Sequence, residues 1–221
     1  MKADRRDMKG IISTILVVLL LAAAERGHAV TLSYNFDSNN AGLAGGPWAT
    51  ITLTDTTYNG LDAVRFQVDP LEEAFYRTYG NFGLQTFYFN SNTNQPDSAL
   101  RSSQVADWRF IYSPGSVGAF KKFELLYQGD GDSRQDPLDF YLYTSSFDIK
   151  AEQFAVSNAE GYMFAGHIAD FGILGKPNLT SAKFASSGAP APAPIPEPGT
   201  VTLFAIGLAA LACCSRRRKR N

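Results

Sequence analysis

Apolar and polar residues alternate in short segments along the middle of the chain. Alternation with a period of two over four to eight residues is typical of a β-strand with one buried face. Three segments show it clearly, namely 30–36, 49–55 and 63–68. Five further runs combine aromatic and β-branched residues over the length of a strand; they are 84–89, 108–112, 120–127, 138–144 and 162–168. The pattern therefore predicts eight or nine strands.

Turn-forming residues separate these runs. Asn59-Gly60 lies between two alternating runs and predicts a two-residue β-hairpin. The segment 69–79 has Pro70 near its start and two glutamates in its first turn, which predicts a helical turn. So many strands without a long amphipathic helix predict an all-β body over residues 30–187. Its expected architecture is an antiparallel β-sandwich or a jelly roll.

The first 29 residues have the pattern of a signal peptide. A continuous apolar run, 11–24, follows four basic residues and precedes a polar pair. Small residues after this pair predict that signal peptidase cleaves between Ala29 and Val30. An uncleaved anchor is the alternative. Translation from Met8 would give a more ordinary leader than translation from Met1, and both starts remain open.

The C-terminal end combines a spacer, an apolar run and a basic cluster. Residues 188–200 form a Pro/Ala linker whose regularly spaced prolines hold the backbone extended. The apolar run 201–214 would form a helix of about 21 Å, shorter than the ~30 Å hydrocarbon core. Basic residues are nevertheless expected on the cytoplasmic side of a membrane span, and five follow the run: Arg216, Arg217, Arg218, Lys219 and Arg220. We therefore predict that 201–221 is a single transmembrane helix with a basic cytoplasmic tail; a nucleic-acid-binding tail is the alternative.

Three elements of this end occur in a specific order: the tripeptide Pro196-Glu197-Pro198, the apolar run and the terminal basic cluster. In this order they resemble the sorting signal of PEP-CTERM proteins. The resemblance implies a Gram-negative host, a precursor anchored in the inner membrane, and processing at the tripeptide by an exosortase. It also implies association with extracellular polysaccharide. The segments 45–56, 87–90 and 161–171 are similar to small β-rich ectodomains of the same group, which supports a sandwich and implies no chemistry.

The net charge of the body limits the classes of molecule that we expect it to bind. Without the two ends, 10 basic and 17 acidic residues remain, a formal net charge of −7. This charge argues against nucleic acid and anionic lipid surfaces, and it is compatible with neutral glycans or divalent cations. Both cysteines, Cys213 and Cys214, belong to the C-terminal run, so the body has to fold without a disulfide.

Catalytic motifs are sparse in the body. His167 is its one histidine, and alternation places it on the strand face opposite Phe164 and Ile168. A single histidine in a strand is more often structural than catalytic. The sequence contains neither a GxSxG elbow nor an HExxH motif. We therefore expect no enzymatic activity, no cofactor and no metal. A secreted hydrolase, with Glu72 or Glu73 paired to a distant carboxylate, is the least favoured function.

Two sets of residues are candidates for ligand binding. Asp130, Asp132 and Asp136 resemble part of a calcium loop, but Arg134 takes the place of one oxygen ligand, so a solvated loop is the favoured interpretation. The tryptophans and several tyrosines of the body are candidates for a flat platform that stacks against sugar rings, although packing in the core is the favoured interpretation. The candidates are Trp48, Trp108, Tyr58, Tyr76, Tyr79, Tyr88, Tyr112, Tyr127, Tyr141 and Tyr143.

From these observations we expect an exported protein of the cell surface or extracellular matrix. Its expected role is structural or adhesive, and a lectin-like carbohydrate-binding module is the alternative. Signal peptidase, an exosortase, the membrane and an extracellular polysaccharide are the expected partners, and nucleic acid is not among them.

Overall fold

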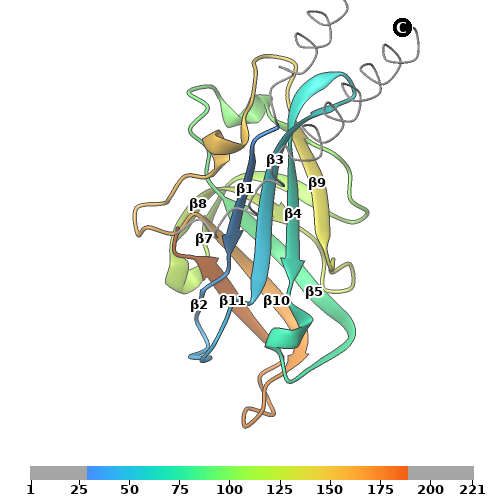
Figure 1. Cartoon of the computed structure of the whole chain (residues 1–221), viewed down its shortest axis with the longest axis vertical. Coiled ribbons are helices and arrows are strands. Elements are labelled where there is room, and N and C mark those ends of the chain that lie inside the picture. The colour runs from blue at the N-terminus through green and yellow to red at the C-terminus, as the bar shows by residue number, and fades with distance from the viewer. Residues whose placement is uncertain (1–28, 189–221) are drawn as a thin grey trace, which may run out of the picture.

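The computed structural model describes residues 29–188, which form two antiparallel β-sheets packed face to face (Figure 1). One sheet has the order β1-β3-β4-β9-β6 and the other the order β2-β11-β10-β5-β8-β7. The strands of the first sheet are β1 (Thr31–Asn35), β3 (Ala49–Tyr58), β4 (Leu61–Pro70), β6 (Arg101–Ser102) and β9 (Leu138–Tyr143). Those of the second are β2 (Ser38–Asn39), β5 (Arg77–Phe89), β7 (Arg109–Ser116), β8 (Lys122–Gln128), β10 (Phe164–Gly172) and β11 (Ser181–Ser186).

The predicted all-β fold with antiparallel sheets is confirmed, and the arrangement is that of a β-sandwich. Each of the eight predicted segments overlaps an observed strand. Short 3₁₀ turns complete the described residues, namely η1 (Glu72–Ala74), η2 (Asp97–Ala99), η3 (Gly118–Phe120) and η4 (Ala151–Phe154). Residues 29–188 include no helix with the length and hydropathy of a membrane span.

The predicted hairpin at Asn59-Gly60 is confirmed. These two residues join β3 to β4, and both have positive φ, 52° for Asn59 and 79° for Gly60. Positive φ at both central residues is the requirement of a type I′ turn, which matches the right-handed twist of the strands. The register follows from the turn, because Tyr58 then pairs with Leu61.

Two expectations need correction. The segment 69–79 is not a helical turn throughout, since only η1 is helical and β5 already begins at Arg77. Thr78 pairs there with Phe171 of β10, so sheet pairing decides the conformation. The short strands β2 and β6 were not predicted, and neither was β11. The sequence of β11, SAKFAS, is rich in small residues and lacks the usual strand composition.

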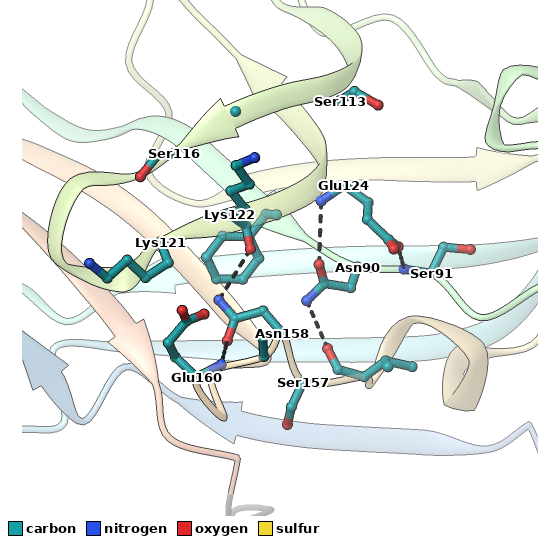
Figure 2. Close-up of a pocket in the computed structure, with 14 residues that line it drawn as sticks. Asn90, Ser91, Ser113, Ser116, Lys121, Lys122, Glu124, Ser157, Asn158 and Glu160 are labelled. Carbon is teal, nitrogen blue, oxygen red and sulfur yellow. Dashed lines mark hydrogen bonds between the residues drawn. The ribbon is translucent and has the colours of Figure 1, made fainter.

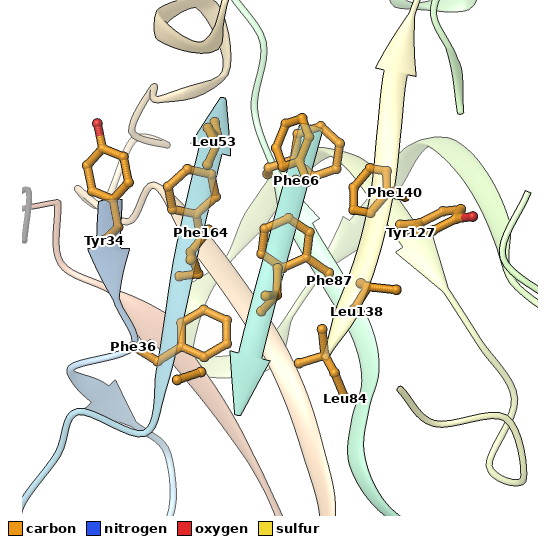
Figure 3. Packing of buried hydrophobic residues seen from close by; sticks show 14 of the residues in the cluster. Tyr34, Phe36, Leu53, Phe66, Leu84, Phe87, Tyr127, Leu138, Phe140 and Phe164 are labelled. Carbon is orange, nitrogen blue, oxygen red and sulfur yellow. The ribbon is translucent and has the colours of Figure 1, made fainter. Parts of the chain in front are cut away.

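Phenylalanine rings from both sheets fill the space between them (Figure 3). Phe66 of β4 lies at the centre, stacked on Phe140 of β9 with ring centroids 4.9 Å apart. From the opposite sheet, Phe89 approaches the Phe66 ring to 5.0 Å and Phe87 approaches it to 6.2 Å. Phe154 of η4 contacts the same ring at 5.7 Å. These aromatic contacts hold the two sheets together.

Side chains pack closely around Gly166 in the core. A Cβ at Gly166 of β10 would lie 2.9 Å from the Leu84 side chain and 2.9 Å from the Phe36 ring. Real Cβ atoms do not approach other atoms so closely, so a side chain here would force the Leu84 side chain of the neighbouring strand β5 and the Phe36 ring to shift.

The predicted signal peptide (1–29), apart from Ala29, lies outside the described residues. The same is true of the linker (188–200) beyond Gly188, the tripeptide Pro196-Glu197-Pro198 and the transmembrane segment (201–221). Val30 is described, and its carbonyl accepts a hydrogen bond from the Asp55 amide. Gly188 lies beside Gly161 and Met163, at the end of β11 away from the loop 173–180.

We predict that replacing Phe66 with alanine lowers the free energy of unfolding by about 3–5 kcal/mol, because the cavity left at the centre cannot collapse. Urea unfolding with an unchanged m-value measures the loss. Tyr76→Ala is the control; this exposed residue should change the stability by no more than about 0.5 kcal/mol. A loss at Phe66 as small as that of the control would contradict the central role of its ring.

Candidate functional site

Both tryptophans of the candidate platform are buried, in agreement with the favoured interpretation that they pack in the core. Trp48 is 2% exposed and packs against Phe75 and Phe184, with ring centroids 5.6 and 5.5 Å away. Trp108 is 8% exposed, and its indole N–H donates to the Ser133 carbonyl at 2.6 Å. Large aromatic rings are the residues that gain most from burial, and the sandwich places both in its core.

An aromatic cluster does lie on the outer face of the five-stranded sheet, and it consists of tyrosines. Tyr58 at the end of β3 stacks on Tyr141 of β9, with ring centroids 4.9 Å apart and an interplanar angle of 22°. Tyr143, two residues further along β9, lies 5.0 Å from Tyr58. All three side chains remain partly exposed. Figure 1 looks onto this sheet, with β3, β4 and β9 side by side.

A small residue between these strands allows the tyrosines to meet. Strand β4 lies between β3 and β9, and its Ala63 pairs with Thr56 on one side and Tyr143 on the other. Ala63 alternates with the core residues Val64 and Phe66, so it points outward, yet it is only 1% exposed. The tyrosine rings therefore cover Ala63, and a larger side chain there would separate them.

An ion pair lies beside the tyrosines. Arg65 Nε donates to Asp139 Oδ1 at 3.0 Å, and a second guanidinium nitrogen donates to Asp139 Oδ2. This hydrogen bond raises the pKa of Arg65, and the opposite charges of the two groups make the pair neutral as a unit. Both side chains remain partly exposed and retain hydrogen-bonding capacity toward solvent. We call Tyr58, Tyr141, Tyr143, Arg65 and Asp139 together the tyrosine strip.

Hydroxyl and amide side chains continue the outer face beyond the strip. Strand β3 contributes a row of threonines, because every second residue of its ATITLTDTTY sequence points away from the core. Thr54 forms a hydroxyl–hydroxyl hydrogen bond of 3.3 Å with Thr31 of β1. Gln67 lies opposite Asp139. The face is therefore polar and aromatic. Its Arg65 and Asp139 are paired with each other, whereas Arg101 of β6 and Asp69 of β4 lie exposed on the same face.

A groove of about 730 Å³ lies elsewhere, between β7, β8 and the segment 156–160 (Figure 2). The Asn90 side chain accepts from the Glu124 amide and donates to the Val156 carbonyl. Asn158 donates to the carbonyls of Phe120 and Lys122. These bonds attach the segment 156–160 to the sheet, so the amides at the base of the groove are already used in holding the fold.

A second groove, of about 530 Å³, lies where the loops near residues 42–48, 73–76 and 173–176 meet. It includes the two most exposed large apolar side chains among the described residues, Leu174 at 75% and Tyr76 at 64%. Exposed apolar groups gathered in this way are typical of contact surfaces. Lys176 closes one side by donating to the carbonyls of Ala41 and Gly42.

The aspartates of the suggested calcium loop do not gather into a cation site. Among residues 29–188, no group of three or more acidic, histidine or cysteine side chains is arranged to hold a metal ion. Asp130 and Asp132 are both exposed. The loop is instead held by hydrogen bonds between Asp130 and Ser133 and by the pairing of Gln135 with Leu84.

Asp136 lies instead near other acidic residues at the end of β4. Desolvation of its carboxyl and the negative charges of Glu72 and Asp69 raise its pKa to about 6. The fold thus brings Glu72 close to a carboxylate that the sequence alone does not identify. All three side chains are exposed and belong to neither groove.

His167 lies within β10, between Thr86 of β5 and Lys183 of β11. Burial, followed by the positive charges of Lys183 and Arg134, lowers its pKa. Its neighbour Ala165 packs in a small outer cluster, whereas Phe164 and Ile168 belong to the core. The predicted alternation of this strand is therefore confirmed.

The tyrosine strip has a weak sequence signal. The run Asp139 to Tyr143, DFYLY, alternates outward Asp139, Tyr141 and Tyr143 with core residues. This pattern identifies one half of the strip. The other half comes from Tyr58 and Arg65, more than 70 residues earlier in the chain, and only the register of β3, β4 and β9 brings them together.

Comparison with known proteins identifies one part of the chain. Residues 194–218 match the family model described as the PEP-CTERM protein-sorting motif. Neither a curated protein nor a solved structure matches the chain. The matched segment lies outside the sandwich, so it indicates how the chain is sorted and leaves open what the sandwich binds.

We predict that the Asp136 carboxyl titrates with a midpoint of about 6, whereas an ordinary aspartate titrates near 3.8. Carboxyl ¹³C NMR measures this midpoint, and Glu72→Gln should lower it by removing a neighbouring charge. The folded state binds this proton more tightly than the unfolded state, so its stabilising contribution is lost as the pH rises from about 4 to 6. Asp132→Asn serves as a control in the same loop. A midpoint near 3.8 would contradict the clustering of these acids.

Proposed function

Because the chain is a PEP-CTERM protein, exported as a membrane-anchored precursor and sorted by an exosortase, we propose a structural or adhesive role for its sandwich. The protein acts at the cell surface or in the extracellular matrix, and it contacts polymers through the outer face of a sheet. It has no catalytic role, and neither a cofactor nor a metal takes part.

The outer face of the five-stranded sheet supports this proposal. It combines threonine hydroxyls, tyrosine rings and a neutral ion pair on one sheet face. Flat polar faces suit attachment to an extended polymer, whereas small-molecule chemistry usually takes place in a concave apolar pocket. The interior is occupied by core side chains, so it provides no such pocket among the described residues.

The two ends of the sandwich are compatible with processing. Val30 precedes β1 and is exposed, so cleavage after Ala29 by signal peptidase leaves every strand intact. Gly188 follows β11 and leads directly into the predicted Pro/Ala linker. Removal of either end therefore takes nothing from the core.

A lectin-like module is the second candidate function, and the tyrosine strip favours it. Aromatic rings beside a bidentate ion pair offer both stacking and hydrogen bonding to a sugar. The two functions differ in specificity: a lectin-like module binds one kind of sugar specifically through this contact, whereas a structural role requires no such specificity. The secreted hydrolase is less favoured, because Glu72 and Asp136 lie outside both grooves and Glu73, which lines the second groove, has no second carboxylate in that lining.

We predict that the protein recovered from cells starts at Val30, lacks the residues after the tripeptide, and sediments with the extracellular polymer fraction. Replacement of Pro196, Glu197 and Pro198 by alanine should leave a longer chain in the membrane fraction, because the exosortase no longer recognises its site. Mass spectrometry of both termini, fraction by fraction, measures this. Processed protein found free in the medium and absent from the polymer fraction would contradict the structural role.

A further inference from the structure

We propose that the tyrosine strip binds a neutral polysaccharide chain lying flat across β3, β4 and β9. The inference deepens the proposed function, because it assigns the polymer contact to one set of side chains. Its failure would leave export and matrix association untouched.

The rings supply the apolar part of the contact. Tyr58 extends over Ala63 to reach Tyr141 and Tyr143, so the three rings form one cluster on an otherwise hydroxyl-rich face. Tyr58 and Tyr141 are stacked on each other and Tyr143 is tilted by 42° to Tyr58, so a sugar would contact the parts of the rings that remain exposed. The C–H faces of a pyranose ring are apolar and pack against aromatic rings, while its hydroxyls point to the sides. Tyrosine provides such contact area at a low cost in conformational entropy, since it has few rotatable bonds.

Polar groups lie where the hydroxyls of such a sugar would point. Arg65 and Asp139 hold one another through two hydrogen bonds, so the donors of one and the acceptors of the other are fixed in place. A preorganised pair of this kind donates to one sugar hydroxyl and accepts from the next without losing side-chain freedom on binding. Gln67 and Thr54 flank the pair and add further donors and acceptors.

The shape of the strip indicates a polymer. Asp139, Tyr141 and Tyr143 occupy alternate positions of one strand, so they span about 14 Å at the rise of an antiparallel strand. This length accommodates more than one sugar ring. The strip also lies on an open sheet face outside both grooves, so a chain can continue beyond it in either direction.

The charges of the strip and of the body favour a neutral polymer over an anionic one. The strip contains one cation and one anion in contact with each other. The body that carries it has 10 basic and 17 acidic residues. The net negative charge of the body would repel an anionic polysaccharide. Arg101 of β6 lies opposite Tyr143 and is exposed, and its guanidinium donates to the backbone carbonyls of Ser98 and Leu100, so an anionic probe tests whether this cation outweighs the charge of the body.

The test uses the full-length protein in detergent micelles and four immobilised polysaccharides. Cellulose, an insoluble β-1,3-glucan and cross-linked dextran are the neutral probes, and cross-linked alginate is the anionic probe. We expect retention on at least one neutral probe and none on alginate. Tyr58→Ala and Tyr141→Ala should each weaken this retention about tenfold, the effect of losing one central aromatic contact.

Matched variants separate binding from folding. Tyr76→Ala removes a tyrosine that is more exposed than those of the strip and lies outside it, and this variant should leave retention unchanged. Tyr141→Phe preserves the ring and should retain most of the affinity, whereas Asp139→Asn preserves the shape, removes the ion pair and should weaken it. Equal retention of all variants, stronger binding to alginate, or no binding to any neutral probe would each overturn the inference. Sedimentation of the protein with the extracellular polymer, measured separately, tests the proposed function itself.

Discussion

Aromatic packing between the two sheets is the interaction on which the rest of the structure depends. The body of this protein has no cysteine, since both cysteines of the chain lie at positions 213 and 214. No disulfide can therefore hold the sheets together, and the phenylalanines around Phe66 do so instead. Burial of such rings is the largest favourable contribution that a small sandwich has available. The core consequently takes up the inward face of each strand, and only the outward faces and loops remain for contacts with other molecules.

Local signals predicted the parts of the fold that depend on local chemistry. Asn59-Gly60 determined a hairpin because both residues accept positive φ. The alternation in β3 and β4 identified their buried faces correctly. Strand β11 was not predicted, because its small residues give no strand signal and it becomes a strand through pairing with β10. The helical turn predicted over 69–79 was wrong for the same reason, because the pairing of β5 with β10 overrides the helical signal near Pro70.

The candidate site was harder to predict, because sequence composition does not distinguish buried from exposed aromatic residues. Trp48 and Trp108 were candidates for a platform with core packing favoured, and both are core residues. The tyrosines of the strip come from strands separated by about half of the sandwich in sequence. They meet only because Ala63 is small and the register places it between them. A site of this kind becomes visible only with the sheet order.

Titration of the protein with a soluble neutral oligosaccharide, followed by amide NMR, tests the central claim most directly. If the uncovered sheet face is the functional surface, shifts will concentrate at Tyr58, Ala63, Arg65, Tyr141 and Tyr143, with the core resonances unchanged. Shifts confined to the groove around Tyr76 and Leu174, or no shifts for any neutral sugar, would contradict it.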